Sequence, residues 1–137
     1  MNLLKSISDV NLLAVIVVTI LSFPLGFLWH SKFLFLNAWK KENKMTDELP
    51  EKVNFAKVFG LTAVFHFIAM LFLATFIGRH STYLEGFVSG FIISIAWVTT
   101  SFGAKYLFVN RSMKLLLIDA GFYVVLYSIA GLILGAW

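Results

Sequence analysis

The sequence predicts an all-α protein, built as a four-helix transmembrane bundle with a short interfacial amphipathic helix after the first span. Four apolar stretches are each long enough to cross the ~30 Å hydrocarbon core of a bilayer, which needs about 20 helical residues. Hydrophobic residues make up 60% of the chain and charged residues 13%, against about 25% charged residues in an average soluble domain. No stretch alternates as a strand would, and backbone groups inside lipid must pair within their own segment, so we expect helices. The predicted spans are residues 11–30, 55–78, 83–108 and 113–137.

The whole chain, residues 1–137, is predicted to form a single integral membrane domain. Its first apolar stretch is longer than the ~7 to 15 residues of a signal-peptide core, and no A-x-A-like cleavage site follows it. We therefore expect a spanning helix there. The sequence has no cysteine, which excludes disulfides, thiolate metal sites and thiol redox chemistry.

The first span contains Pro24, whose missing N–H and bulky ring are expected to bend the helix. A bend at this point would redirect Trp29 and His30 at the end of the span. These two residues form a candidate cytoplasmic mouth. A gating hinge is the functional interpretation of Pro24, and packing between helices is the structural one.

The first connector, residues 31–54, predicts the interfacial helix. Its apolar residues precede a group of lysines: Phe33, Phe35, Leu36 and Trp39, then Lys40, Lys41 and Lys44. This order favours a helix in the headgroup layer, with its aromatic side chains toward lipid and its lysines toward water. The helix would serve as an anchor for the first span or, alternatively, as a lid or lipid-binding element. Residues 46–50 are expected to form a polar turn before Asn54, a candidate N-cap of the second span.

Small residues mark two faces for close helix packing. The third span carries Gly86 and Gly90 at an interval of four, and the fourth repeats this G-x-x-x-G spacing with Gly131 and Gly135. Gly121 extends the stripe on the fourth span at heptad spacing. We interpret one face as an intramolecular contact and the other as a candidate seam of a homo-oligomer.

Polar residues inside the spans form a candidate ligand cluster, because charges near the bilayer centre cost on the order of 3 kcal/mol. The cluster is His66, Asp119, Lys105, Thr100, Ser101 and Trp97. A tight hairpin between the third and fourth spans would place Asp119 at the depth of Thr100 and within reach of Lys105. Asp119 is either a hydrogen-bonded structural clasp or a carboxylate that handles protons or cations. His66 is either a hydrogen-bonding partner of a neighbouring helix or a proton relay.

Signatures of metal binding and catalysis are missing from the sequence. His30, His66 and His80 share no helical face and show no H-x-x-x-H or H-E-x-x-H spacing, so we expect no metal site. No G-x-S-x-G motif, phosphate-binding glycine loop or cysteine nucleophile is present. We assign no catalytic residue and no cofactor from the sequence.

Basic residues predict the orientation of the spans. The first connector and its ends carry six of them, the third connector is flanked by three, and two lie elsewhere: Lys32, Lys40, Lys41, Lys44, Lys52 and Lys57, then Lys105, Arg111 and Lys114, against Lys5 and Arg79. Because basic residues stay on the cytoplasmic side, both connectors are predicted there and both termini outside. The net charge of +4 then favours contact with membrane lipids, and we expect no nucleic-acid binding.

Three segments carry a resemblance to a known family. Residues 25–31, Leu-Gly-Phe-Leu-Trp-His-Ser, and residues 111–123 with 131–137 resemble the bacterial membrane proteins of domain-of-unknown-function family 1761. The chain departs from the family pattern at Lys32, where Pro is expected, at His30, where Tyr is expected, and at Asp119, where Asn is usual. An amide hydrogen-bonds but does not titrate, which favours the structural clasp. The resemblance implies a small multi-span protein of a bacterial cytoplasmic membrane, without an established activity.

Three functions are compatible with these patterns. The leading hypothesis is a small membrane protein whose oligomer forms a binding site or a permeation path, as in a transporter or channel. The second is a structural or regulatory subunit that docks a larger membrane complex through the glycine faces. The third is a membrane-embedded enzyme, which would require an enclosed pocket beside His66 or Asp119.

Overall fold

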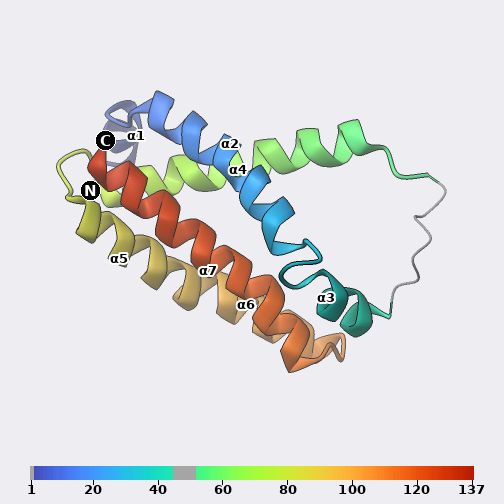
Figure 1. Cartoon of the computed structure of the whole chain (residues 1–137). Coiled ribbons are helices and arrows are strands. Elements are labelled where there is room, and N and C mark those ends of the chain that lie inside the picture. The colour runs from blue at the N-terminus through green and yellow to red at the C-terminus, as the bar shows by residue number, and fades with distance from the viewer. Residues whose placement is uncertain (1, 45–51) are drawn as a thin grey trace.

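A computed structural model of the chain describes residues 2–44 and 52–137, and these residues form helices and no strand (Figure 1). Four helices within the described residues are long and apolar enough to span a membrane, which confirms the expected all-α fold. The third of them comprises three consecutive segments, residues 83–93, 94–99 and 100–108. The helices are α1 (Leu3–Ser8), α2 (Leu12–Trp29), α3 (Leu36–Asn43), α4 (Phe55–Ile77), α5 (Tyr83–Ile93), η1 (Ser94–Thr99), α6 (Thr100–Phe108) and α7 (Met113–Ala136).

Side-chain caps define where the spans begin, because the first N–H groups of a helix lack partners within it. The Asn11 side chain accepts from two backbone N–H groups of α2. The Asn54 side chain accepts from one in α4, which confirms the predicted N-cap. Thr82 and Glu85 form a capping box at the start of α5. Pro24 lies inside α2 and does not end it. The predicted turn at residues 46–50 lies outside the described residues.

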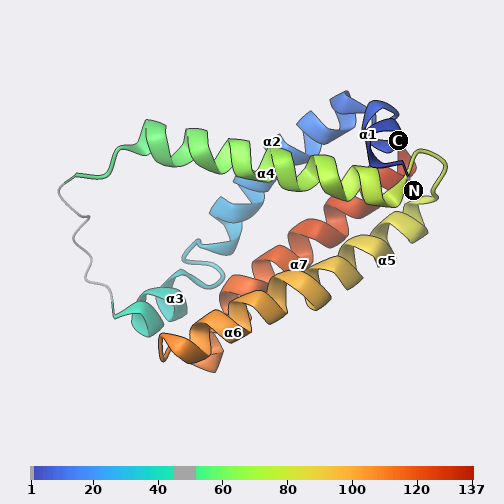
Figure 2. The ribbon, with the colours of Figure 1, turned by 180° about the vertical axis from the view of Figure 1, so that it is seen from behind.

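The third span and α7 form a tight antiparallel hairpin (Figures 1 and 2). A methyl group placed on Gly86 would lie 2.0 Å from the carbonyl oxygen of Gly131, and one on Gly90 would lie 2.0 Å from that of Tyr127. One on Gly135 would lie 2.4 Å from the carbonyl oxygen of Thr82. Both G-x-x-x-G motifs therefore pack against each other within one chain. Self-association remains a prediction and would need another surface.

A π-helical turn, η1, interrupts the third span. The hydroxyl of Thr99 donates to the carbonyl of Ser94, five residues earlier, at 2.9 Å. Ser94 is buried, and its hydroxyl donates to the carbonyl of Phe91. An extra residue in a turn rotates everything that follows by about 100°, so α6 presents a different face than a regular helix would. Sequence periodicity did not predict this turn.

The core lies where α2, α4 and α7 meet, and contains Val15, Val18, Met70, Leu73, Phe122 and Leu126. The second half of α4 packs near both termini, whereas its first half stands apart from α6 and α7 (Figure 2). Many large apolar side chains face outward, among them Ile20, Phe65, Phe76 and Leu117. Lipid is the medium that suits this surface.

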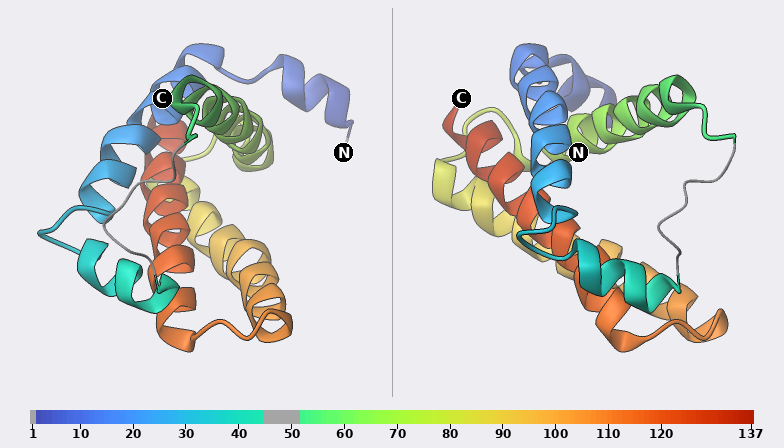
Figure 3. Two further views of the ribbon diagram at one scale, coloured as in Figure 1. Left: turned by 90° about the vertical axis from the view of Figure 1, so that its right-hand side faces the viewer. Right: turned by 45° about the vertical axis from the view of Figure 1, so that its right-hand side comes forward.

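The two ends of the bundle carry different parts of the chain. Both termini lie at one end, and α3 lies at the other, beside the start of α7 (Figure 3). There the Arg111 guanidinium donates to the Asn43 side chain at 3.3 Å, and the Ser112 hydroxyl donates to Glu42. The first and third connectors therefore share one end, as four spans require.

Candidate functional site

A cavity of about 650 Å³ lies between α2, α3, α4, α6 and α7, and we call it the aromatic cavity. Half of its lining residues are Phe, Trp or Tyr: Phe23, Phe27, Phe59, Phe102, Phe122, Trp39 and Tyr123. Its polar groups come from three helices. Ser22 and the C-cap residue His30 belong to α2, Thr62 and His66 to α4, and Asp119 to α7. Mostly apolar walls with a few convergent polar groups are typical of small-molecule sites.

Helical periodicity brings these side chains to one place. Ser22, Gly26 and His30 lie four residues apart and form one stripe of α2. Thr62 and His66 form the corresponding stripe of α4, with the same interval. The divergence of the first half of α4 leaves the space between these stripes and α7 unfilled.

His66 is buried and joins α4 to α2. Its Nδ1 lies 2.7 Å from the hydroxyl of Ser22, which itself donates to the carbonyl of Thr19 at 2.6 Å. The Ser22 proton is thus directed to a backbone carbonyl, so the imidazole Nδ1–H is placed to donate to the serine oxygen. The ring is also 6.2 Å from that of Phe23. A buried polar group needs a partner of this kind, and the pair secures the crossing of the two helices.

Asp119 joins three elements through its two carboxylate oxygens. Oδ1 accepts from the indole N–H of Trp39 on α3 at 2.9 Å, and Oδ2 accepts from the hydroxyl of Tyr106 on α6. Both donors are neutral, so they orient the carboxylate without cancelling its charge. A charge placed against low-dielectric walls interacts more strongly with a ligand than it would in water. Asp119 is therefore both a structural clasp and a potential ligand contact.

The two residues of the candidate mouth have different positions. The indole N–H of Trp29 donates to the carbonyl of Ile118 at 2.9 Å, and its ring packs against Gly121 and, with a centroid separation of 4.6 Å, against Phe35. Trp29 thus fastens the end of α2 to α7. His30 lines the aromatic cavity, where its ring meets the edge of Trp39 at 5.6 Å.

The remaining residues of the predicted cluster lie away from this cavity. Lys105 and Ser101 are exposed, and the hydroxyl of Thr100 donates to the carbonyl of Ala96 in its own helix. Trp97 is exposed beside Phe76 and lines a separate cavity of about 310 Å³. Two of the six residues, His66 and Asp119, thus line the same cavity. The π turn of η1 rotates the residues that follow it, Thr100 to Phe108, relative to a regular α-helix.

The sequence did not predict the hydrogen-bond partners of His66 and Asp119. Trp39 was expected to face lipid from an interfacial helix, but its indole N–H points to Asp119 and α3 packs on α7. Neither Tyr106 nor Ser22 was predicted to be part of the site. A usable signal existed, because indole N–H and phenol O–H groups at membrane depth require acceptors. Periodicity alone did not show which acceptor each would find.

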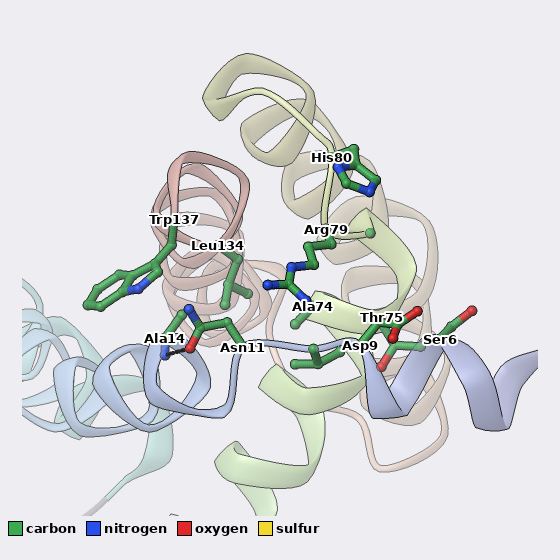
Figure 4. A pocket seen from close by; sticks show the side chains of 12 residues that line it. Ser6, Asp9, Asn11, Ala14, Ala74, Thr75, Arg79, His80, Leu134 and Trp137 are labelled. Carbon is green, nitrogen blue, oxygen red and sulfur yellow. Dashed lines mark hydrogen bonds between the residues drawn. The ribbon is translucent and has the colours of Figure 1, made fainter.

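A second cavity, of about 560 Å³, lies at the end where the termini meet. Figure 4 shows Arg79 reaching between α7 and the residues that join α1 to α2, with Trp137 across the opening. Asp9 and His80 also line it, so it presents both signs of charge. Across residues 2–44 and 52–137, no three His, Cys, Asp or Glu side chains are grouped closely enough to hold a metal ion.

A comparison with protein families shows what the chain is related to. Residues 13–135 match the family described as a protein of unknown function, DUF1761. The chain belongs to this family. The resemblance found in the sequence is thereby confirmed. The DUF1761 match includes every residue that lines the aromatic cavity. No curated protein and no solved structure matches the chain.

Proposed function

We propose that this protein is a membrane-embedded binding module that holds a small amphiphilic molecule in the aromatic cavity. The observation that carries the proposal is that His66 and Asp119, from two separate helices, both line one cavity of about 650 Å³ in which half of the lining residues are Phe, Trp or Tyr. Phenylalanine rings would contact the apolar part of the ligand. The polar part would contact Asp119 and His30 on the side nearer α3.

Permeation through an oligomer is the extended form of this proposal. Release of the ligand toward either leaflet would make the module part of a transporter. Docking to a larger membrane complex through the glycine faces has less support, because Gly86, Gly90, Gly131 and Gly135 already contact the opposite helix of the same hairpin. An enzymatic role has least support, since the Ser22 hydroxyl donates to a backbone carbonyl.

Filling the cavity tests the proposal. Thr62 lines the aromatic cavity from α4, so Thr62→Trp is expected to exclude a ligand. The probe is monolaurin, a neutral single-chain amphiphile, added to purified protein, and the readout is retained adduct in native mass spectra. We expect the wild-type protein to retain monolaurin and Thr62→Trp to retain at most about a tenth as much.

The matched control is Thr100→Trp, which adds the same indole at an exposed position of α6. It should retain monolaurin like the wild type. Equal retention by Thr62→Trp and Thr100→Trp would contradict binding in the aromatic cavity.

We further propose that the protein lies in a bacterial cytoplasmic membrane with both termini outside. The positive charges of the first and third connectors support this orientation. The chain lacks cysteine, so single cysteines report position directly. Leu4 lies in α1, and Val109 is the C-cap of α6; both are exposed. Because α1 and the end of α6 lie at opposite ends of the bundle (Figure 1), Leu4→Cys and Val109→Cys report on the two ends.

In intact spheroplasts, an impermeant maleimide is expected to label Leu4→Cys. Val109→Cys should be labelled only after permeabilisation. The reverse pattern would contradict the proposed orientation.

A further inference from the structure

We infer that the aromatic cavity selects lipophilic organic cations, meaning amines or onium ions with apolar substituents. This inference rests on the proposed function and adds the sign of the ligand's charge. Three features carry it: an orientated carboxylate, the absence of Lys and Arg among the described residues of the wall, and aromatic rings on both sides of the space.

The carboxylate is Asp119, and its charge is not cancelled by its hydrogen-bond partners. Trp39 and Tyr106 each donate one neutral hydrogen bond to it. Each oxygen retains acceptor capacity, since a carboxylate accepts about four hydrogen bonds. A charge withdrawn from water is stable when it meets an opposite charge.

Neither lysine nor arginine supplies that opposite charge among the described residues of the cavity wall. The described residues that line the aromatic cavity include neither Lys nor Arg. Arg111, near the same end, directs its guanidinium to Asn43 on α3. Lys105 is exposed on α6. A cationic ligand would therefore be the counter-ion of Asp119.

Aromatic rings provide the second attraction for a cation. On the wall formed by α2 and α4, the ring of Phe59 lies 6.1 Å from that of Phe23 and 5.9 Å from that of Phe27. On the wall formed by α6 and α7, the ring of Tyr123 lies 5.6 Å from that of Phe102. The faces of such rings carry negative charge and attract cations within about 6 Å, most strongly where water is excluded.

A pair of ions with the same shape and opposite charge tests the inference. Tetraphenylphosphonium and tetraphenylborate are measured by equilibrium dialysis against purified protein, with empty detergent micelles as the baseline. We expect the cation to bind at least about tenfold more tightly than the anion, because Asp119 attracts one and repels the other. Asp119→Asn should weaken cation binding about tenfold while leaving the anion unchanged or slightly tighter.

The matched control is Asp9→Asn, the same exchange in the cavity at the opposite end. It should leave cation binding unchanged. Phe59→Leu, which keeps the wall apolar but removes a ring, should weaken phosphonium binding about threefold and weaken tetraphenylborate binding less. This variant tests the inference even if Asp119→Asn does not fold.

The outcomes separate the two proposals. Retention of monolaurin without preference for the phosphonium would overturn the inference and leave the proposed function standing. If the protein retained no monolaurin and bound no tetraphenylphosphonium, both the proposed function and the inference would be overturned. Equal cation binding by Asp119→Asn and wild type would also overturn the inference, because the carboxylate would then contribute nothing.

Discussion

Replacing Gly90 by alanine is expected to separate α5 from α7 and to destabilise the folded protein by about 3 kcal/mol or more. The added Cβ would lie 2.0 Å from the carbonyl oxygen of Tyr127 and 2.7 Å from its carbonyl carbon. Both atoms belong to the backbone of α7, so no side-chain rotation relieves the clash. Thermal unfolding in detergent, followed by the loss of monodisperse protein, measures the effect.

Gly60→Ala is the control for this substitution. Gly60 also lies inside a spanning helix, but a Cβ there would meet no atom within 4 Å. Alanine is the better helix former, so stability should stay the same or rise by up to about 1 kcal/mol. Equal losses from Gly60→Ala and Gly90→Ala would contradict the packing of α5 on α7.

Replacing Phe122 by alanine is expected to cost about 2 kcal/mol or more. Its side chain is 7% exposed, with its ring 5.1 Å from that of Tyr123 and 6.3 Å from that of Trp29. Surrounding lipid is as apolar as the core, so the loss comes mainly from the packing contacts and the space left behind. The midpoint of thermal unfolding should fall accordingly.

Phe108→Ala removes the same ring from a residue that is 93% exposed and should change stability by less than about 0.5 kcal/mol. The two variants differ in burial and not in chemistry. A loss at Phe108 as large as that at Phe122 would mean that the core does not include α7 in the way described.

The fold was predictable because a span is a local property of the chain. The length and apolar composition of residues 55–78 and 83–108 predict two spanning helices. The thickness of the hydrocarbon core sets the length that a span needs, and its apolar interior sets the composition. Asn54 likewise predicted the start of α4, because its side chain accepts from the backbone N–H of Lys57, only three residues away. The short α1 and the π turn η1 depend on local exchanges of hydrogen bonds that periodicity does not reveal.

The candidate site was predictable only in part. His66 and Asp119 stood out because polar groups inside a span are costly and must be satisfied. Their partners did not stand out: Trp39 is 80 residues from Asp119, and Ser22 is 44 residues from His66. The two glycine motifs, Gly86 with Gly90 and Gly131 with Gly135, are also far apart in the sequence. The sequence therefore did not show that they contact each other within one chain.

The composition along the chain was therefore enough to predict that lipid surrounds the protein, that the chain has four spans and that the fold is all-α. The fold is helical because each span must pair its own backbone groups inside lipid. The aromatic cavity depended on the arrangement of the helices in space. It exists because the first half of α4 diverges from α7 while α3 folds back to place Trp39 on Asp119. Such contacts join residues by helix rotation and crossing, and neither quantity is encoded in any one segment.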